Sequence, residues 1–300
     1  MTSSSKLAKR LGFGTLLIAA LTALLLLDGY LTCQIDQTAS PGPTGGLTAA
    51  LIILALATIG CFEIANLLQK KGLSPSAPAM ALASALVLMQ PYWQKLLPIP
   101  PAASLALAIL ACLALGGLQQ ARKRQNANTL TNLAALALAA VYLGIGGWFI
   151  LQIRLLGLPQ PRIWGQIAPL TMFLITVKSC DIGAYFTGRY LGRHKWVPAI
   201  SPAKTWEGLA GGCALAAIVA SIFAAASAII PLLWAPLFGV AIALAGQLGD
   251  LLESMLKRDA DVKDSASLIP EFGGVLDLLD SVLAAAPLAY ILFNMCTPAQ

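Results

Sequence analysis

Residues 208–228 read GLAGGCALAAIVASIFAAASA, an apolar run without a charged side chain. A helix needs about 20 apolar residues to cross the roughly 30 Å hydrocarbon core of a bilayer, and this run has that length. Its glycines and alanines have little side-chain volume, so a second helix can approach the backbone closely, as helices do in membranes. The run therefore predicts a membrane-spanning helix that packs tightly against a neighbour.

Runs of this kind recur along the whole chain of 300 residues. The sequence is 58% hydrophobic and 11% charged, whereas a typical soluble protein is about 25% charged. Strand patterns are weak throughout, and only helices or closed barrels satisfy their backbone groups inside a bilayer. We therefore predict an all-α, polytopic integral membrane protein with about nine transmembrane helices. The predicted spans are residues 13–32, 48–67, 77–93, 102–118, 131–151, 166–186, 208–230, 232–252 and 275–294.

The two halves of the chain differ in the polar residues that they carry. We expect one integral membrane domain, with N-terminal scaffold helices over residues 1–160 and C-terminal catalytic helices over residues 161–300. In the first half the exception is Glu63, a carboxylate inside a predicted span, which either caps or pairs within the bundle or takes part in function. The six cysteines have no paired spacing, which is typical of packing residues rather than of a disulfide framework.

Basic residues are distributed unevenly between the two predicted sides of the membrane. With a cytoplasmic N-terminus, fifteen lysines and arginines lie inside, three (Lys95, Arg154 and Arg162) lie outside, and Lys178 lies in or near the sixth span. The positive-inside rule supports this orientation. We therefore expect a multi-pass protein of a bacterial inner (plasma) membrane, with its polar sites facing the cytoplasm. The net charge of +6 favours contact with anionic lipid headgroups and is no argument for nucleic-acid binding.

A dense group of charges separates two of these apolar runs. Residues 249–281 read GDLLESMLKRDADVKDSASLIPEFGGVLDLLDS, in which eleven residues are acidic or basic. Charge at this density beside a membrane span is costly and points to chemistry. The segment therefore predicts a functional site, and the alternative interpretation is a solvated cytoplasmic loop.

The spacing of these charges predicts the geometry of the site. Four polar residues lie at i, i+3, i+4 and i+7, which places them on one stripe of a helix, and a second pair repeats the i, i+3 spacing. Carboxylate oxygens suit a hard divalent ion such as Mg²⁺, whereas lysine and arginine suit phosphate. The pattern favours a nucleotide-phosphate site over a redox or acyl-transfer site. The stripe is Asp250, Glu253, Ser254 and Lys257, the second pair is Asp277 and Asp280, and the further cations are Arg258 and Lys263.

A second polar cluster occupies residues 178–208, KSCDIGAYFTGRYLGRHKWVPAISPAKTWEG. Asp181 and Tyr185 are one helical turn apart, and Ser201 followed by proline is a helix-start or turn signal. Lys204 is placed to meet an anion. The alternative interpretation is an ordinary cytoplasmic hairpin with interfacial tryptophans as membrane anchors.

Both clusters resemble the phosphatidate cytidylyltransferase (CDP-diacylglycerol synthase) family. SPAKTWEG resembles its SPKKTWEG-type motif, and residues 254–280 resemble its signature S-x-[LIVMF]-K-R-x4-K-D-x-[GSA]-x2-[LIF]-[PG]-x-H-G-G-[LIVMF]-x-D-R-x-D. Two positions depart from the signature: Phe272 replaces its histidine and Leu278 replaces its arginine, so neither position can donate to phosphate. The matching positions are Ser254, Leu256, Lys257, Arg258, Lys263, Asp264, Ala266, Ile269, Pro270, Gly273, Gly274, Val275, Asp277 and Asp280.

This resemblance implies a reaction and a role for each residue. It implies transfer of CMP from CTP to phosphatidate, which gives CDP-diacylglycerol and pyrophosphate in phospholipid biosynthesis. Mg²⁺ is the expected cofactor, with a second cation implied by the family. The expected catalytic residues are Lys204, Lys257, Arg258, Lys263 and Asp264, the substrate-binding residues are Asp181, Tyr185, Ser201, Glu253, Ser254, Gly273 and Gly274, and the metal ligands are Asp250, Asp277 and Asp280.

The expected partners are CTP, phosphatidate and membrane lipids, without nucleic acid, and the sequence leaves a monomer or a homodimer open. Two alternatives to the implied function also stay open. One is a cytidylyltransferase or kinase that acts on another lipid phosphate or lipid. The other is a non-catalytic membrane scaffold or transporter derived from the family, which the departures at Phe272 and Leu278 keep open although the implied metal ligands are retained.

Overall fold

Apolar helices make up almost all of the structure, a computed structural model that describes residues 19–34, 45–73, 75–97, 99–122, 129–156, 163–262, 265–266 and 273–296. Seven helices are long and apolar enough to cross a membrane, and two shorter apolar helices cover Ala19–Gln34 and Ala77–Leu88. Within these ranges the backbone forms no strand, and its β-bridge residues are isolated ones, such as the pair Lys195 and Thr205. The prediction of an all-α, multi-pass membrane protein with about nine helices is confirmed.

The helices follow the predicted spans with one clear difference. The span predicted at residues 77–93 is interrupted at Met89, because Pro91 has no N–H with which to continue the helical hydrogen bonds. Residues Thr129–Leu155 form one continuous span that contains a π-helical segment. The bounds are α2 (Leu47–Lys70), α3 (Ala77–Leu88), α4 (Gln90–Trp93), η1 (Gln94–Leu96), α5 (Pro101–Arg122), α6 (Thr129–Ala139), η2 (Ala140–Ile145), α7 (Gly146–Leu155), α8 (Ile163–Tyr190), α9 (Trp206–Ser227), α10 (Ala235–Asp259) and α11 (Val275–Cys296).

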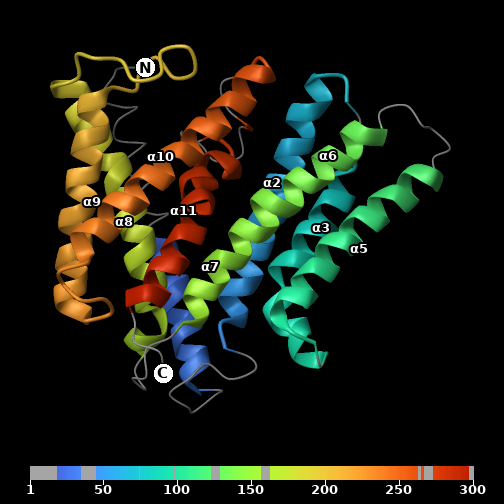
Figure 1. Cartoon of the computed structure of the whole chain (residues 1–300), viewed down its shortest axis with the longest axis horizontal. Coiled ribbons are helices and arrows are strands. Elements are labelled where there is room, and N and C mark those ends of the chain that lie inside the picture. The colour runs from blue at the N-terminus through green and yellow to red at the C-terminus, as the bar shows by residue number, and fades with distance from the viewer. Residues whose placement is uncertain are drawn as a thin grey trace.

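The helix α11 occupies a central position between two groups of helices (Figure 1). On one side, α8 packs against α9, α9 against α10, and α10 against α11. On the other side, α2 and α7 contact α11 and also pack against α3, which in turn contacts α5 and α6. Side chains of α11 can therefore meet residues from α2, α8 and α10, which are far apart in sequence.

Small residues bring α8, α9 and α10 into close contact. A Cβ atom added to Gly183 on α8 would lie 2.8 Å from the backbone oxygen of Gly211 on α9. A Cβ atom added to Gly239 on α10 would lie 2.5 Å from the backbone oxygen of Ala216. Any larger side chain at these two glycines would force the helices apart. The predicted tight packing of the run at residues 208–228 is thus confirmed.

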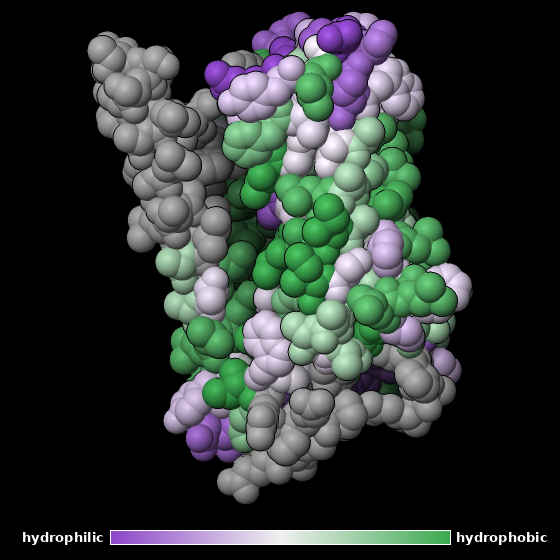
Figure 2. Space-filling model, turned by 90° about the vertical axis from the view of Figure 1, so that its left-hand side faces the viewer, coloured by the Kyte–Doolittle hydropathy of each residue, from purple (hydrophilic) through white to green (hydrophobic). Residues whose placement is uncertain are grey.

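The two charged segments meet at one polar end of the molecule. Lys71, just after α2, pairs with Asp259 at the end of α10, with 3.1 Å between the ammonium nitrogen and the carboxylate oxygen. Arg258 Nε donates to the backbone oxygen of Ile200 in the connection between α8 and α9, at 3.4 Å. Figure 2 shows hydrophilic residues gathered at this end, above a broad belt of hydrophobic side chains. Charge and apolar surface are therefore separated along the helices, as a bilayer requires.

A buried ion pair joins the Ala19–Gln34 helix to α7. The side chains of Asp28 and Arg154 are 1% and 0% exposed, and Nε and Oδ2 are 2.5 Å apart. Arg154 also donates to the backbone oxygen of Gln166 at 2.8 Å and to Thr32 Oγ1 at 3.1 Å. The second carboxylate oxygen of Asp28 accepts from the N–H of Ala49 in the first turn of α2. The network fixes the relative positions of four helices, because every charged group in it has a partner.

Candidate active site

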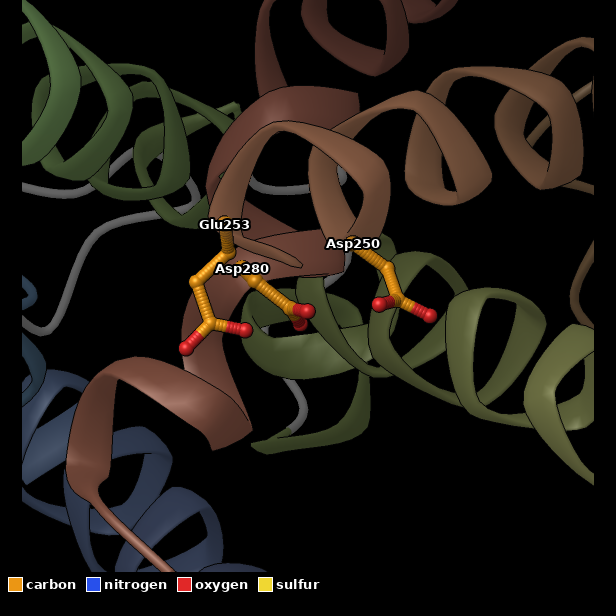
Figure 3. A group of neighbouring side chains, drawn as sticks. All are labelled: Asp250, Glu253 and Asp280. Atoms are coloured by element: carbon orange, nitrogen blue, oxygen red, sulfur yellow. The ribbon is translucent and has the colours of Figure 1, made fainter. Parts of the chain in front are cut away.

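Three carboxylates from two helices converge near the polar end. Asp250 and Glu253 lie one turn apart on α10, and Asp280 projects from α11. One carboxylate oxygen of each lies within 4.8 Å of the others. In Figure 3 the three side chains extend to the same side, with the carboxylate of Asp280 between the other two. The packing of α10 against α11 thus joins parts of the two predicted carboxylate sets in one group.

The residue Glu253 is held in this group by one lysine. Lys257 Nζ lies 2.9 Å from Glu253 Oε2 and also pairs with Asp277 Oδ1. The side chain of Glu253 is 1% exposed, yet its other oxygen, Oε1, accepts no hydrogen bond from any described residue. A buried carboxylate oxygen without a donor is costly unless it meets a cation or a proton.

The residue Asp277 has a different environment from the three grouped carboxylates. Its Oδ1 accepts from Lys257, and its Oδ2 accepts from the backbone N–H of Gly274 at 2.6 Å and from the N–H and hydroxyl of Ser265 at 3.2 and 3.0 Å. Gly274 directly precedes α11, so Asp277 satisfies an N–H at the helix start. Both oxygens of Asp277 are therefore already occupied by donors.

The start of α11 is held by Glu63 of α2. Glu63 accepts from the N–H groups of Val275 and Leu276, both at 2.8 Å, and its Oε2 lies 3.0 Å from the Ser265 hydroxyl, whose single proton it shares with Asp277. Its side chain is 1% exposed. A Cβ atom added to Gly274 would lie 2.6 Å from Glu63 Oε2, so this contact requires glycine at position 274. Of the two roles left open for Glu63, the structure therefore supports capping.

A pocket of about 410 Å³ opens beside Asp250, between α8, α9 and α10. Lys204, from the connection between α8 and α9, borders the pocket and pairs with Asp250 Oδ2 at 2.9 Å. Asp181 and Tyr185 of α8 also line the pocket. A pocket of this size can admit a small molecule, and its lining combines cationic, anionic and aromatic side chains.

The lysine Lys178 enters the site from the middle of α8. Its ammonium nitrogen lies 3.3 Å from Asp181 Oδ2 and donates to the backbone oxygen of Leu278 on α11 at 3.2 Å. Asp280, next along α11, is 5% exposed, and no described lysine or arginine forms an ion pair with it. The site therefore holds a buried carboxylate without a described counter-ion.

Five further predicted site residues lie among the described residues: Ser254, Tyr185, Arg258, Ser201 and Gly273. Ser254 Oγ donates to Asp250 Oδ1 at 3.3 Å, within the predicted stripe. Tyr185 accepts from Arg189 at 2.6 Å and is exposed. Arg258 Nε donates to the backbone oxygen of Ile200, the neighbour of Ser201 in the turn at residues 197–201, and neither Arg258 nor Ser201 belongs to the three grouped carboxylates. Gly273 adopts a left-handed backbone, with φ of 90°, a conformation that glycine tolerates best.

Two predicted site residues, Lys263 and Asp264, lie outside the described residues, as does Phe272. Ser201 lies in a turn, and α9 begins only at Trp206. The helix is capped by Thr205, whose hydroxyl accepts from the N–H of Gly208 at 3.1 Å. The signal at residue 201 therefore marks a turn.

Sequence reasoning assigned no role to two residues of the site. The sequence places Lys178 in or near a span without indicating a partner, and Gln247 of α10 lines the pocket beside Asp250. The backbone oxygen of Gln247 also accepts from Lys204 at 3.5 Å. The one available signal was the lysine itself, because an ionisable residue inside a membrane span is a functional candidate by default.

The charges of the whole arrangement do not balance within the described residues. Five carboxylates meet three lysines here: Asp181, Asp250, Glu253, Asp277 and Asp280 against Lys178, Lys204 and Lys257. An excess of carboxylates with an unpartnered oxygen suits a hard divalent cation with oxygen ligands. The adjoining lysines suit phosphate oxygens. Together these groups can align and stabilise a polyanion at the edge of the pocket.

Comparison with known proteins points to one family. A model described as the Cytidylyltransferase family matches residues 43–296. A Bacillus subtilis protein named phosphatidate cytidylyltransferase is 33% identical over 253 residues, which cover 84% of this chain and 90% of that protein. Proteins of the same name from Brucella suis and Haemophilus influenzae are 40% and 41% identical over 146 and 143 residues. These two matches cover 48% and 46% of this chain and about half of each relative, 53% and 49%.

Proposed function

The chain belongs to the cytidylyltransferase family, and from that premise we propose that it transfers CMP from CTP to phosphatidate, giving CDP-diacylglycerol and pyrophosphate. The observation that carries this assignment is the group formed by Asp250, Glu253 and Asp280 at the edge of a pocket that Lys204 borders. Carboxylates for a divalent ion beside lysines for phosphate are the groups that nucleotidyl transfer requires. The curated relatives carry the name of this enzyme.

We assign the divalent-ion site to Asp250 and Asp280, with Glu253 as the third carboxylate. The fit rests on the oxygen-only donor set, on Oε1 of buried Glu253, which has no described donor, and on Asp280, which forms no ion pair with a described residue. Mg²⁺ in this position would neutralise charge on the phosphates of CTP and hold them in line for displacement. Asp277, which the sequence assigned to the metal, is bonded on both oxygens, so we assign it to positioning Lys257 and the start of α11.

The lysines of this site hold phosphate oxygens in our proposal. Lys204 lies at the pocket edge, 2.9 Å from Asp250, where it can pass from the carboxylate to an incoming phosphate. Lys257 is fixed by two carboxylates on α10 and α11, so its charge stays at one position while the substrate binds. Fixed cations of this kind stabilise the charge that moves onto the leaving group. Arg258, Lys263 and Asp264 remain predicted phosphate-binding or orienting residues.

The chemical step requires alignment more than proton transfer. An oxygen of the phosphatidate phosphate forms a bond to the α-phosphorus of CTP, while the bond from that phosphorus to the bridging oxygen of the β-phosphate breaks. Pyrophosphate leaves with the electron pair. A phosphate monoester has a second pKa of about 6, so the attacking oxygen is largely ionised near neutral pH and needs no strong base. The chain can therefore react without a histidine at position 272.

The location of the site suits a lipid substrate. The carboxylate group lies in the last turns of α10 and the first turns of α11. The sides of the molecule are hydrophobic between its polar ends (Figure 2). The acyl chains of phosphatidate can remain in the bilayer while the headgroup reaches the pocket. We further propose that this end faces the cytoplasm of a bacterial inner membrane, which agrees with its concentration of basic residues. All three carboxylates of the group come from one chain, so the site does not require a second copy. A homodimer stays a prediction.

The test is a pyrophosphate-release assay on the purified full chain in detergent with CTP, Mg²⁺ and phosphatidate. We expect one pyrophosphate for each CDP-diacylglycerol. A panel of isoprenoid, ether-lipid and other lipid phosphates, run with labelled CTP, separates the proposal from its alternatives. If product forms only with a lipid phosphate other than phosphatidate, the assigned substrate class is wrong and that lipid phosphate replaces it. Absence of nucleotide turnover with every lipid would support a scaffold or transporter and contradict the proposal.

A further inference from the structure

One lysine in the site has a position that the proposed reaction does not yet explain. Lys178 lies twelve residues before the end of α8 at Tyr190, in a helix apolar enough to span a membrane. At 1.5 Å per residue that distance is about 18 Å along the helix. An ammonium group within a membrane-spanning helix is costly unless it has a partner and a use. The residue is therefore a candidate for a role in the site.

The contacts of Lys178 connect two helices within the carboxylate site. Its ammonium nitrogen bonds to Asp181 on its own helix and to the backbone oxygen of Leu278 on α11, at 3.3 and 3.2 Å. Residue 278 lies between Asp277 and Asp280, so the charge of Lys178 reaches the stretch of α11 that carries both carboxylates. Its side chain is still 40% exposed, so the ammonium group keeps access to a ligand or to water.

The excess of carboxylates around Lys178 makes its contact with the backbone of Leu278 significant. Lys204 and Lys257 pair with Asp250, Glu253 and Asp277, which leaves Lys178 as the third described lysine among five carboxylates. The side chain at position 278 is leucine and carries no charge. An ammonium group bonded to the backbone of that residue supplies positive charge at the same position of α11. It also opposes repulsion between the carboxylates and an approaching phosphate.

We propose that Lys178 is a positioning residue of the CMP-transfer site, which supplies from α8 the positive charge that residue 278 lacks and holds Asp181 and α11 in register. This inference rests on the proposed function. Lys178 acts through Asp181 and α11, because its contacts are to the protein. The neutral variant Lys178→Met should therefore impair alignment of the substrates, and Leu278→Arg should compensate for it.

The experiment compares Lys178→Met, Lys178→Arg, Leu278→Arg and the double variant Lys178→Met/Leu278→Arg in the full chain. Lys71→Met is the matched control, because the Lys71 side chain is 39% exposed and pairs with Asp259 at 3.1 Å, at the same polar end but outside the carboxylate group. Three quantities are measured: CDP-diacylglycerol formation at saturating CTP and Mg²⁺, the affinity for Mn²⁺ alone, and the thermal unfolding temperature in detergent.

We expect Lys178→Met to lower turnover at least about tenfold, as small misplacements of reacting groups do. Lys178→Arg should stay within about threefold of the parent chain because it keeps the positive charge. Lys71→Met should do so because its ion pair with Asp259 lies outside the carboxylate group. Leu278→Arg should recover at least about fivefold in the Lys178→Met background, because it restores the charge. Mn²⁺ should bind Lys178→Met more tightly, since a repelling cation has been removed.

Two results would overturn the inference. One is parental turnover in Lys178→Met, and the other is a double variant no more active than Lys178→Met when both proteins unfold at the parental temperature. Failure of the proposed function is distinguishable, because the parent chain would then make no CDP-diacylglycerol. In that case Mn²⁺ affinity decides: tighter binding in Lys178→Met supports the role of Lys178 in the charge balance, and unchanged binding contradicts it.

Discussion

Two groups of charged residues in this protein, one buried and one largely buried, differ in how completely their charges are matched. In the first, Asp28 pairs with Arg154 and every charged group has a partner from the Ala19–Gln34 helix, α2, α7 or α8. In the second, Asp250, Glu253 and Asp280 lie within 4.8 Å of one another. There, Asp280 has no described counter-ion and one oxygen of Glu253 has no described donor.

The difference separates a structural use of charge from a chemical one. A matched and fully bonded pair fixes the helices that contribute to it, and removing one partner leaves an uncompensated buried charge. Adjacent carboxylates repel each other and lower stability until a cation binds. Substitutions of the same residue types should therefore affect different quantities. In the first group they should reduce stability, and in the second they should reduce activity.

The largest expected effect is on activity. Asp280→Asn and Asp250→Asn should each lower CDP-diacylglycerol formation at least about a thousandfold, because each removes a ligand of the proposed divalent ion. Asp277→Asn should also abolish turnover, through loss of its contacts with Lys257 and the start of α11. The unfolding temperature of Asp280→Asn should equal or exceed that of the parent, since repulsion is relieved. A variant that stays active, or that unfolds well below the parent, would contradict the comparison.

The second effect falls on stability. Arg154→Met leaves Asp28 buried without its partner, so we expect a loss of about 3–5 kcal/mol in folding free energy. Thermal unfolding in detergent measures it, and turnover per folded molecule should be retained. The double variant Asp28→Leu/Arg154→Met is the control, because it removes both charges and should recover most of the stability. An unchanged unfolding temperature in Arg154→Met would show that this network is not structural.

A third prediction concerns Glu63, which links the two kinds of effect. Glu63→Gln removes the negative charge that strengthens the hydrogen bonds from the N–H groups at the start of α11. We expect a loss of about 1–3 kcal/mol in folding free energy. Turnover should also fall, because α11 carries Asp277 and Asp280. Both quantities are measured on the same preparation. Glu207→Gln serves as control, since Glu207 lies in the first turn of α9 with a 25% exposed side chain. Equal losses in the two variants would remove the special role of Glu63.

The smallest effect is expected at Ser254. Its hydroxyl lies 3.3 Å from Asp250 Oδ1, a long and weak hydrogen bond, so Ser254→Ala should lower turnover only about threefold. Ser221→Ala on α9, whose hydroxyl bonds to the Ala217 backbone oxygen, should leave turnover unchanged. A loss in Ser254→Ala as large as that in Asp250→Asn would place the hydroxyl among the essential groups of the site.

The sequence predicted the parts of this comparison that depend on local spacing. The helix spans follow from apolar run length, and α10 continues to Asp259, so the stripe from Asp250 to Lys257 lies on one helix as expected. The metal assignment of Asp277 stays a prediction that our proposal revises. Its spacing matches that of Asp280, but its contacts with Lys257, Ser265 and Gly274 arise from the way α11 begins.

Contacts between distant segments could not be predicted from spacing. Glu63 meets Val275 across 212 residues, Arg154 meets Asp28 across 126, and Lys178 meets Leu278 across 100. Each depends on which helices lie side by side, and apolar spans of similar composition carry little information about their neighbours. The sequence therefore located Glu63 inside a span and Lys178 in or near one, but it did not identify their partners.

The most direct test of the central claim is the binding of Mn²⁺, as a spectroscopic substitute for Mg²⁺, followed by electron paramagnetic resonance on the purified chain. The variants are Asp280→Asn and Asp259→Asn, the latter a carboxylate of α10 outside the group. We predict saturable binding to the parent and to Asp259→Asn, and its loss in Asp280→Asn. Binding to Asp280→Asn with the parental affinity would contradict the assignment of these carboxylates to a divalent ion.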